Sequence, residues 1–449
     1  MAIDIFSFAD EVDERDEYTY KVLIYGNYTY RDNLEADSLV VVLRNVIPYL
    51  SKRYKIHFTI LTPQLIKSLA FPNVEQVIWR LPSYINTMRC HFDATEFLKI
   101  IDWREKDFDI IYSHLPEHTA QIANCIYNNS HFRPKIVGYS HWFEVPENAP
   151  YEKTMLMASL AGVLEMEECG VNSKWLKNLV LEEAKKYLVP DKIAELDRII
   201  QPHYLGVDAT LPRSKTIVPK SVIFNHRPSS YTGWDWFIKV VDEIWQSRQD
   251  FTVYSTLAQV DRPWSKKIVA TSREEYLQKL STMQFGVGCF QSYSAWSISV
   301  TDGLSVNVPY LLPNDFCYPE MVPADYPYLY ESREDFIAKF NAMLDTTDYI
   351  DTKPIAQSMT WESRIEEWFG GWDSVFSLKG MKEDTEGYNK VLTIIRDAGY
   401  ITKADLIDKL GWGVHIKWTG YRNRLRNHPN IRFTKHGYEW RSNGTNDTK

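Results

Sequence analysis

A single acidic residue, Asp302, stands in a stretch of apolar and small residues and is the first candidate for chemistry. The pattern around it predicts a short buried strand at residues 284–290, a half-buried helix at residues 296–304 and a second strand at residues 308–312. Such a βαβ unit presents the carboxyl ends of its parallel strands to ligands. A buried carboxylate needs hydrogen-bond donors, and the two hydroxyls of a ribose would supply them. The alternative is an aspartate that only caps or solvates a helix.

Two histidines follow predicted strands. His114 comes after residues 109–113, and His141 comes after residues 136–140. Ligand-binding residues gather at the carboxyl ends of parallel strands, so both histidines are candidates for contact with a ligand. Trp142 is a further candidate contact, since an aromatic ring can stack on a sugar or a base. Glu144 is a candidate general base. Structural histidines and a surface glutamate would give the same pattern.

Basic residues follow two strands further along the chain. Arg227 comes after a predicted strand at residues 221–225, and its guanidinium has the fork of donors that suits a diphosphate. Lys266 and Lys267 come after the strand at residues 251–255 and could supply a second cation, although lysines in a loop are usually only solvated. These residues indicate phosphate binding.

Gly26 separates the first predicted strand, residues 21–26, from the first predicted helix, residues 33–51. A glycine there lets a phosphate or a sugar approach the backbone. A simple tight turn explains the residue equally well. Two helix starts are also marked, because Thr232 and Ser272 each precede a helical pattern and can act as N-caps.

Composition limits the class of protein. The chain has 449 residues, 44% of them hydrophobic and 24% charged, which fits two or three soluble globular domains. Its five cysteines show no metal-binding spacing and fit a reducing cytosol. The acidic start is not a signal peptide, and no apolar run is long enough to span a bilayer, so we expect a cytoplasmic protein without a membrane partner. A net charge of −8 argues against a protein that is basic all over.

Strands and helices alternate along most of the chain, which predicts parallel sheets covered on both faces. We therefore expect an α/β protein with two Rossmann-like domains that face a cleft. The predicted boundaries are an acidic leader at 1–20, a first domain at 21–208, a linker at 209–220 and a second domain at 221–376. The second domain ends with a helix at residues 361–369.

The stretch Asp302-Gly-Leu-Ser-Val-Asn-Val-Pro-Tyr310 resembles the nucleotide-sugar site of GT-B glycosyltransferases, especially the large retaining family. In that family, two acids separated by seven residues lead into Ala-Leu-Ala-x-Gly-x-Pro-Val. Asp302 stands at the second acid, and Ser294 stands at the first. The chain also has the family's Gly-Val-Asp, at residues 206–208.

The resemblance implies a role for each matching residue. Asp302 would bind the ribose, Arg227 would hold the diphosphate, and His141 would lie beside the transferred sugar. Ser294 and Thr232 replace an acid and a lysine of the family pattern. The helix at residues 361–369 would cross back to the first domain. The co-substrate would be a nucleotide sugar, expected to be a UDP-sugar, with no bound cofactor and no metal.

The last part of the chain changes character. Residues 386–396, 403–410 and 416–427 predict three helices, and residues 430–440 predict a hairpin. Three helices and a hairpin form a winged helix-turn-helix, here 386–441, whose third helix enters the major groove of DNA. Residues 415–441 hold seven lysines and arginines and a single acid, which is typical of phosphate binding. The expected DNA contacts are Lys417, Arg422, Arg424, Arg426, Arg432 and Lys435. The alternative is a winged helix that binds protein, and residues 442–449 read as a polar tail.

Together these features resemble bacteriophage enzymes that glycosylate modified bases in DNA, which would place the protein in a host cytoplasm. The predicted activity is transfer of a sugar from a nucleotide donor to a hydroxyl of a modified base in double-stranded DNA. The first alternative is a glycosyltransferase for a small molecule, lipid or polysaccharide, with a protein-binding tail. The second is a DNA-binding regulator that only senses a nucleotide sugar.

Overall fold

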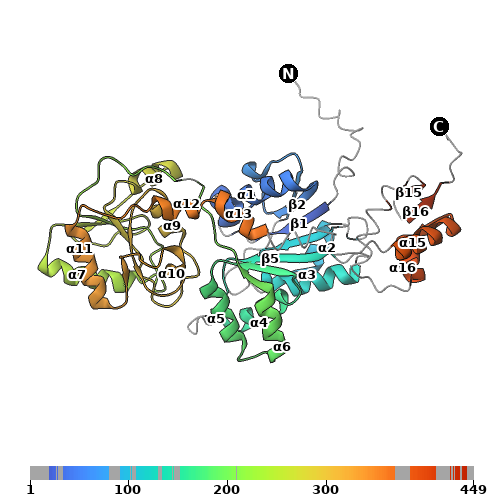
Figure 1. Cartoon of the computed structure of the whole chain (residues 1–449), viewed down its shortest axis with the longest axis horizontal. Helices are drawn as coiled ribbons and strands as arrows, with labels where there is room; N and C mark the ends of the chain where they lie inside the picture. Colours follow the sequence, from blue (N-terminus) through green and yellow to red (C-terminus); the bar gives the residue numbers. More distant parts are fainter. Residues whose placement is uncertain are drawn as a thin grey trace, which may run out of the picture. The chain divides into compact units, whose positions relative to one another are not determined.

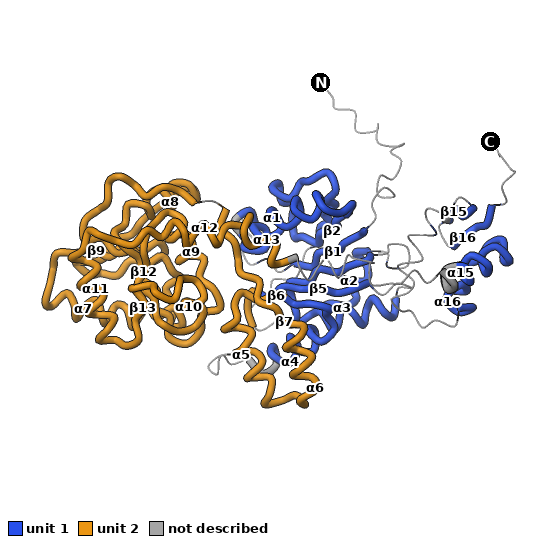
Figure 2. The backbone as a smooth tube through the Cα atoms, viewed as in Figure 1, with its two compact units in different colours: residues 1–140, 153–169, 370–449 blue, residues 141–152, 170–369 orange. Residues whose placement is uncertain are grey.

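The computed structural model of the chain describes residues 20–26, 28, 34–79, 92–101, 103, 108–129, 134–143, 145, 152–208, 210–369, 385–410, 425, 428, 430–434 and 437–441. By internal contacts the chain divides into two compact units (Figure 2). The first comprises residues 1–140, 153–169 and 370–449, and the second comprises residues 141–152 and 170–369. The domain boundaries predicted from the sequence stay a prediction.

The first large sheet has seven strands in the order β3-β2-β1-β4-β5-β6-β7 (Figure 1). The pairs from β3 to β5 are parallel, as the apolar strand runs predict. Its strands are β1 (Tyr20–Tyr25), β2 (Ile56–Thr62), β3 (Val74–Ile78), β4 (Ile110–Ser113), β5 (Lys135–Ser140), β6 (Glu168–Val171) and β7 (Ile200–Pro202).

Helices connect these strands. They are η2 (Leu34–Ala36), α1 (Ser38–Arg53), η3 (Lys67–Leu69), α2 (Ala94–Ile100), α3 (Pro116–Asn129), α4 (Glu152–Val163), α5 (Lys174–Ala184) and α6 (Pro190–Ile199). Asp37 caps α1 through its side chain, and Ser173 caps α5 in the same way. This alternation of strand and helix is the predicted α/β arrangement.

The second large sheet has six strands in the order β10-β9-β8-β11-β12-β13, and every neighbouring pair is parallel. They are β8 (Ser221–Phe224), β9 (Thr252–Ser255), β10 (Ser265–Lys267), β11 (Phe285–Val287), β12 (Tyr310–Pro313) and β13 (Leu329–Tyr330). The predicted strands at 221–225, 251–255, 284–290 and 308–312 are therefore confirmed, with ends that differ by up to three residues.

Both faces of this sheet are covered by helices (Figure 1). Successive residues of β8 point to opposite faces, so Val222 and Phe224 belong to one core and Ile223 belongs to the other. The first core packs α7 (Trp234–Ser247) and α11 (Arg333–Asp345) on the sheet. The other core includes residues of α8 (Arg273–Leu280), α9 (Ile298–Ser305), α10 (Tyr318–Met321) and α12 (Lys353–Ser358).

The starts of α7 and α8 test two predicted caps. Ser272 accepts a hydrogen bond from the backbone N–H of Glu275 at 3.1 Å, so the predicted cap of α8 is confirmed. The prediction that Thr232 caps α7 is wrong. Gly233 holds the N-cap position in a left-handed conformation, with φ of 73°, and Thr232 instead donates its hydroxyl to the carbonyl of Arg227 at 2.6 Å. This hydrogen bond joins two residues of the loop that precedes α7.

The helix α13 (Trp361–Phe369) follows the second sheet. Its Trp368 indole donates to the carbonyl of Tyr204 at 2.9 Å and stacks on His203, with ring centroids 5.6 Å apart. The backbone around Val207 also pairs with Thr360 in a short parallel bridge. The helix therefore packs on the segment that follows β7. That it crosses back to a first domain stays a prediction.

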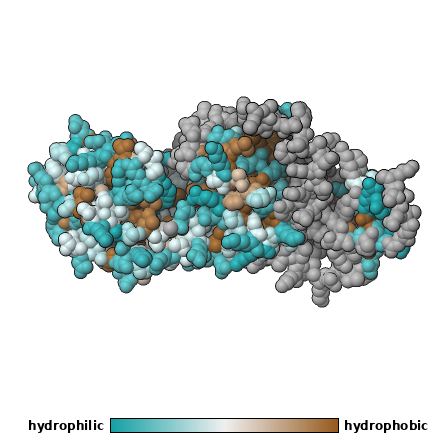
Figure 3. Space-filling view, turned by 90° about the horizontal axis from the view of Figure 1, so that it is seen from above, coloured by the Kyte–Doolittle hydropathy of each residue, from teal (hydrophilic) through white to brown (hydrophobic). Residues whose placement is uncertain are grey.

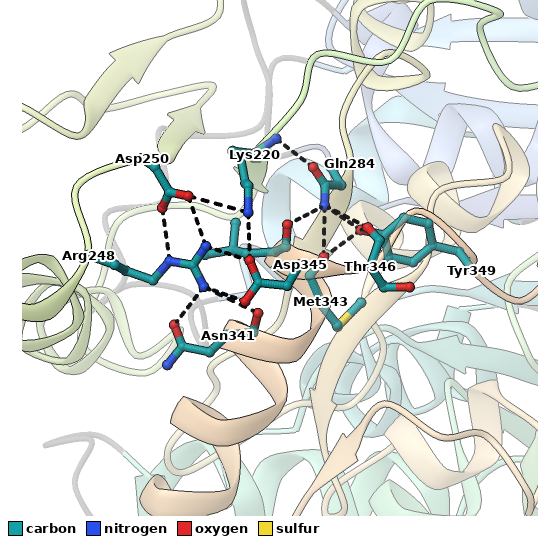
Figure 4. Close-up of polar contacts among 10 residues, drawn as sticks. Lys220, Arg248, Asp250, Gln284, Asn341, Met343, Asp345, Thr346 and Tyr349 are labelled. Carbon is teal, nitrogen blue, oxygen red and sulfur yellow. Dashed lines mark hydrogen bonds and ion pairs between the residues drawn. The ribbon is translucent and has the colours of Figure 1, made fainter.

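A polar clamp holds the amino ends of the strands in the second sheet (Figure 4). The buried amide of Gln284 accepts from the backbone N–H of Lys220 at 2.5 Å and donates to the carbonyl of Met343 at 2.8 Å. Arg248 pairs with both Asp250 and Asp345, at 2.9 and 2.8 Å. The clamp joins the end of the predicted linker to the end of α11.

The C-terminal part has a hydrophobic core of its own, which includes Val391, Ile395, Leu406 and Tyr438. It consists of α15 (Thr385–Ala398), β14 (Tyr400–Thr402), α16 (Lys403–Leu410), β15 (Ile431–Phe433) and β16 (Gly437–Trp440). The three strands form an antiparallel sheet in the order β14-β16-β15. The first two predicted helices and the hairpin are confirmed, and most of the third predicted helix, 416–427, lies outside the described residues.

The visible surface of the described residues is mostly hydrophilic, with hydrophobic residues in small separate areas (Figure 3). Among the described helices, none is both long and apolar enough to cross a membrane.

Candidate functional site

The candidate site lies where the strands of the second sheet end. Asn225, His226 and Arg227 follow β8, and Cys289 and Phe290 come shortly after β11. The loop after β8 packs tightly against the segment after β11, because a Cβ atom on Gly233 would lie 1.7 Å from the carbonyl oxygen of Cys289. A glycine is required at this contact, and it also provides the positive φ angle.

Asp302 lies in the middle of α9 with 5% of its surface exposed. Its Oδ1 accepts from Nη2 of Arg273 at 2.8 Å, and its Oδ2 lies 3.4 Å from Nη1 of the same side chain. Burial raises the pKa of Asp302, and the pairing with Arg273 opposes this effect. Because Ser297 is the N-cap of α9 and Asp302 is buried, the alternative of an aspartate that only caps or solvates the helix is wrong.

Asn225 is the centre of a hydrogen-bond network beside Asp302. Its side-chain amide donates to the hydroxyl of Tyr276 at 2.8 Å and to the carbonyl of Ser299 at 2.9 Å. The hydroxyl of Tyr310 donates to Oδ1 of Asn225 at 3.0 Å, and the hydroxyl of Ser299 donates to the Asn225 carbonyl at 2.8 Å. Burial raises the pKa of Tyr276. The network fixes the start of α9 against the end of β8.

The sequence analysis missed Asn225, Tyr276 and Arg273. The only available signal for Asn225 was its place directly after a strand, where ligand-binding residues gather. Tyr276 and Arg273 lie on α8, which was recognised only as a helix. Their contacts with α9 and β8 depend on how the elements pack.

His226 also follows β8 and is buried, with 4% of its surface exposed. Its Nε2 lies 3.0 Å from the carbonyl oxygen of Val287, and its ring contacts those of Phe224 and Phe290. Burial lowers its pKa to about 4, so the imidazole is neutral at pH 7. A neutral donor to Val287 is a structural tie between β8 and β11.

The predicted cations lie in the loop after β8 and in the edge strand β10 of the same sheet. Arg227 is exposed, and its carbonyl is held by Thr232. Lys266 and Lys267 are exposed as well, but they belong to the edge strand β10 and pair in register with Tyr254 and Ser255 of β9. They lie in a strand, where the sequence analysis expected a loop after β9.

Ser294, at the position of the first acid in the resemblance, is 2% exposed. Its hydroxyl lies 3.5 Å from the Sγ atom of Cys317, and its carbonyl accepts from the backbone N–H of Cys317 at 3.3 Å. The side chain is therefore turned toward α10. A sugar contact by Ser294 stays a prediction.

His141 and Trp142 follow β5 and are half-buried. The carbonyl of His141 accepts from the side-chain amide of Asn172 at 2.9 Å. The ring of Trp142 lies 4.0 Å from that of Tyr293 and 5.9 Å from that of Tyr231, measured between centroids. Tyr231 belongs to the loop after β8, and Tyr293 precedes Ser294. The structure thus brings Trp142 to the two loops of the candidate site.

Glu320 of α10 is a further residue that the sequence analysis missed. Its carboxylate accepts hydrogen bonds from the backbone N–H groups of Lys174 and Trp175, at 2.8 and 2.7 Å, and from the hydroxyl of Tyr204 at 2.8 Å. An anion at the start of α5 is favourable for the helix dipole. Trp175 also contacts Tyr293, with ring centroids 5.3 Å apart, so Glu320 and Tyr293 hold the same helix end.

Two predicted residues of the first sheet are buried. His114 is 2% exposed and its ring lies 4.4 Å from that of Tyr112, which are the surroundings of a structural histidine. A Cβ atom on Gly26 would lie 2.5 Å from Leu39, so close packing on α1 accounts for this glycine. Ligand contacts by His114 and Gly26 stay predictions.

Several predicted contacts lie outside the described residues, namely Glu144, Lys417, Arg422, Arg424, Arg426 and Lys435. Arg432 is exposed on β15 and lies 3.8 Å from Glu439. Within the described ranges, no three His, Cys, Asp or Glu side chains are grouped so that they could hold a metal ion.

Comparison with known proteins adds information about the fold. A scan against protein-family models finds no match, and a search of curated proteins finds none. Among solved structures, HepE of Anabaena in complex with UDP-glucose is similar, with a TM-score of 0.59 and 11% identity, over 79% of this chain and 100% of that one. Sucrose-phosphate synthase from Thermosynechococcus elongatus gives a TM-score of 0.59 at 11% identity, over 80% of this chain and 99% of that one.

A glycosyltransferase from Rickettsia africae is also similar, with a TM-score of 0.55 at 11% identity, over 80% of this chain and 99% of that one. At such low identities the likeness concerns the fold. The chain has two Rossmann-like sheets and the GT-B fold of glycosyltransferases, as the sequence predicted.

Proposed function

We propose that the protein is a glycosyltransferase that moves a sugar from a nucleotide donor, a UDP-sugar, to a hydroxyl of a modified base in DNA. The observation that carries this proposal is the buried, paired carboxylate of Asp302 at the ligand edge of the second sheet in a GT-B fold. HepE, which shares this fold, was solved with UDP-glucose. A nucleotide donor therefore suits the candidate site.

The residues around the site have separate tasks in this proposal. Arg227 binds the diphosphate and stabilises the charge that develops on the leaving group, with Lys266 or Lys267 as a second cation. His141 lies beside the transferred sugar, and Glu144 is the candidate base for the acceptor hydroxyl. The transition state resembles an oxocarbenium ion, as in other glycosyl chemistry. The reaction needs no metal in this scheme, because protein cations balance the diphosphate.

DNA as the acceptor is supported by the C-terminal part of the chain. Its two described helices and three-stranded sheet have a separate core, and the segment at residues 415–441 is strongly basic. A winged helix would bind the duplex through phosphate contacts. A base inside the duplex would then have to be flipped toward the transferase site, at a cost of roughly a few kcal/mol.

The test is a transfer assay read by mass spectrometry. The full chain is incubated with several UDP-sugars and, in separate reactions, with a hydroxymethylated DNA duplex, the same duplex unmodified, and free sugars. A mass increase of one sugar residue on the hydroxymethylated duplex alone supports the proposal. Transfer only to free sugars favours the small-molecule alternative, and tight UDP-sugar binding without any transfer favours the regulator.

A variant of the proposed donor site shows whether the transfer depends on that site. The Arg227→Ala protein should bind DNA as the wild type does and should transfer much less sugar. Transfer at the wild-type rate by this variant would remove Arg227 from the donor site.

A further inference from the structure

A cluster of three charged residues lies at the edge of the candidate site. Arg273 begins α8, Asp302 lies in α9, and Asp208 follows the short bridge that starts at Val207. Arg273 contacts both oxygens of Asp302, at 2.8 and 3.4 Å. Burial and the pairing of Arg273 with Asp302 have the largest effects on the pKa values of these two residues, and Asp208 adds a smaller effect on both. Parts of the chain far apart in sequence therefore build one charged cluster.

The accessible member of this cluster is the guanidinium. The side chain of Arg273 is 53% exposed, whereas that of Asp302 is 7% exposed. Both carboxylate oxygens of Asp302 face Arg273, and Tyr276 also hydrogen-bonds to this carboxylate. A ligand that approaches from solvent meets Arg273 first. It would reach Asp302 only after the arginine had moved away.

The charge of the cluster indicates which ligand it suits. The positive charge of Arg273 is already paired with the carboxylate of Asp302, so a diphosphate gains little from binding here. Neutral hydroxyl groups carry no such penalty, and they accept hydrogen bonds from a guanidinium. Arginine has five N–H donors, of which two point to Asp302. The remaining donors fit a pair of neighbouring hydroxyls.

We propose that Arg273, held in position by Asp302, binds the two ribose hydroxyls of the nucleotide donor. This inference rests on the proposed function and changes the predicted role of Asp302. Asp302 becomes a positioning residue that acts through Arg273. The arginine becomes the residue that distinguishes a ribose from a sugar without these hydroxyls.

The test compares uridine with 2′,3′-dideoxyuridine by titration calorimetry on the full chain. The wild type should bind uridine about ten-fold more tightly, since it makes two further hydrogen bonds. Arg273→Met should abolish this preference and leave the affinity for 2′,3′-dideoxyuridine within about two-fold. Arg262→Met is the control, because Arg262 is 47% exposed and also pairs with an aspartate, through its Nε at 3.0 Å from Oδ1 of Asp242. The control should keep the wild-type preference.

Asp302→Asn tests the positioning role, since asparagine keeps one acceptor oxygen for Arg273. Its preference for uridine should be intermediate, and the double variant with Arg273→Met should show no further loss. If Arg273→Met binds uridine as the wild type does, or more tightly, the inference is wrong. A double variant clearly weaker than Arg273→Met would also contradict it, because Asp302 would then bind the ribose directly.

The same titrations separate this inference from the proposed function. A wild-type chain that binds neither UDP nor uridine would overturn both. A chain that binds UDP with an unchanged ribose preference in Arg273→Met would overturn the role of Arg273 alone. Circular dichroism and thermal unfolding of each variant show whether a loss of binding is a loss of folding.

Discussion

The carboxylate of Glu320 accepts a hydrogen bond from the backbone N–H of Trp175 at 2.7 Å. The two residues are 145 positions apart in sequence. Trp175 packs on Tyr293, and α10, which carries Glu320, begins directly after Cys317, the neighbour of Ser294. The start of α5 is therefore fixed by the loop that carries Ser294.

Replacing Glu320 with alanine should lower the free energy of unfolding by about 1–2 kcal/mol, because two backbone N–H groups of α5 lose their acceptor. Urea unfolding followed by fluorescence measures this change. Glu362→Ala is the control, since Glu362 is exposed on α13. Equal stability of the two variants would show that water replaces the carboxylate without cost.

Arg227→Ala should weaken UDP binding by about ten-fold or more, because a charge-assisted contact with the diphosphate is lost. Uridine has no phosphate, so its affinity should change by less than about two-fold. Calorimetry with both ligands gives the comparison. Equal losses for UDP and uridine would place Arg227 outside the diphosphate site.

His141→Ala should lower turnover by about 10²-fold or more, while the KM for the donor stays within about three-fold. The backbone carbonyl of His141, which is bound by Asn172, is kept in this variant. Initial rates at several donor concentrations separate the two parameters. A variant with wild-type turnover would return His141 to a structural role.

The clamp at the amino ends of the strands should make the stability of the fold depend on pH in the acid range. Arg248 and Lys220 lower the pKa of Asp345, and Arg248 and Lys220 also lower that of Asp250. The unfolded aspartates have a pKa of about 3.9, so their stabilising contribution is complete above this value and is lost as the pH falls through the lower folded values. Asp345→Asn should therefore melt below the wild type at pH 6, and the difference should shrink steadily as the pH falls below about 4.

The variant Arg422→Ala, Arg424→Ala, Arg426→Ala should bind duplex DNA more weakly and with a flatter salt dependence. Each lost phosphate contact lowers the slope of log K against log salt by roughly one unit. Fluorescence anisotropy at several salt concentrations measures it. An unchanged slope would favour the small-molecule alternative.

The control for this triple variant removes three exposed lysines from α6 and from the segment between α5 and α6. These are Lys185, Lys186 and Lys192. A similar loss of DNA affinity in the control would mean that overall charge, and not the C-terminal segment, binds the duplex.

The strands of both sheets and the helices between them are predicted well from the sequence. The patterns that predict them, apolar runs with Gly or Pro at their ends, involve only residues that are close together in the chain. The site followed only in part. Asp302 was singled out as the one acid in an apolar stretch, but Arg273, 29 positions earlier, was not linked to it. The network of Asn225 was missed as well, since its partners come from α8, α9 and β12. Thr232 failed as a predicted cap for a local reason, because its hydroxyl donates to the carbonyl of Arg227 in the same loop.

The clamp of Gln284, Lys220, Arg248 and Asp345 lies at the amino ends of the strands, and it includes no residue of the loops after β8 or β11. The contacts that hold the second sheet and its helices together are thus separate from the residues assigned to the donor. Substitutions in the donor loops leave these anchoring contacts in place. The second sheet with its helices is for this reason a good starting point for laboratory evolution toward other nucleotide sugars.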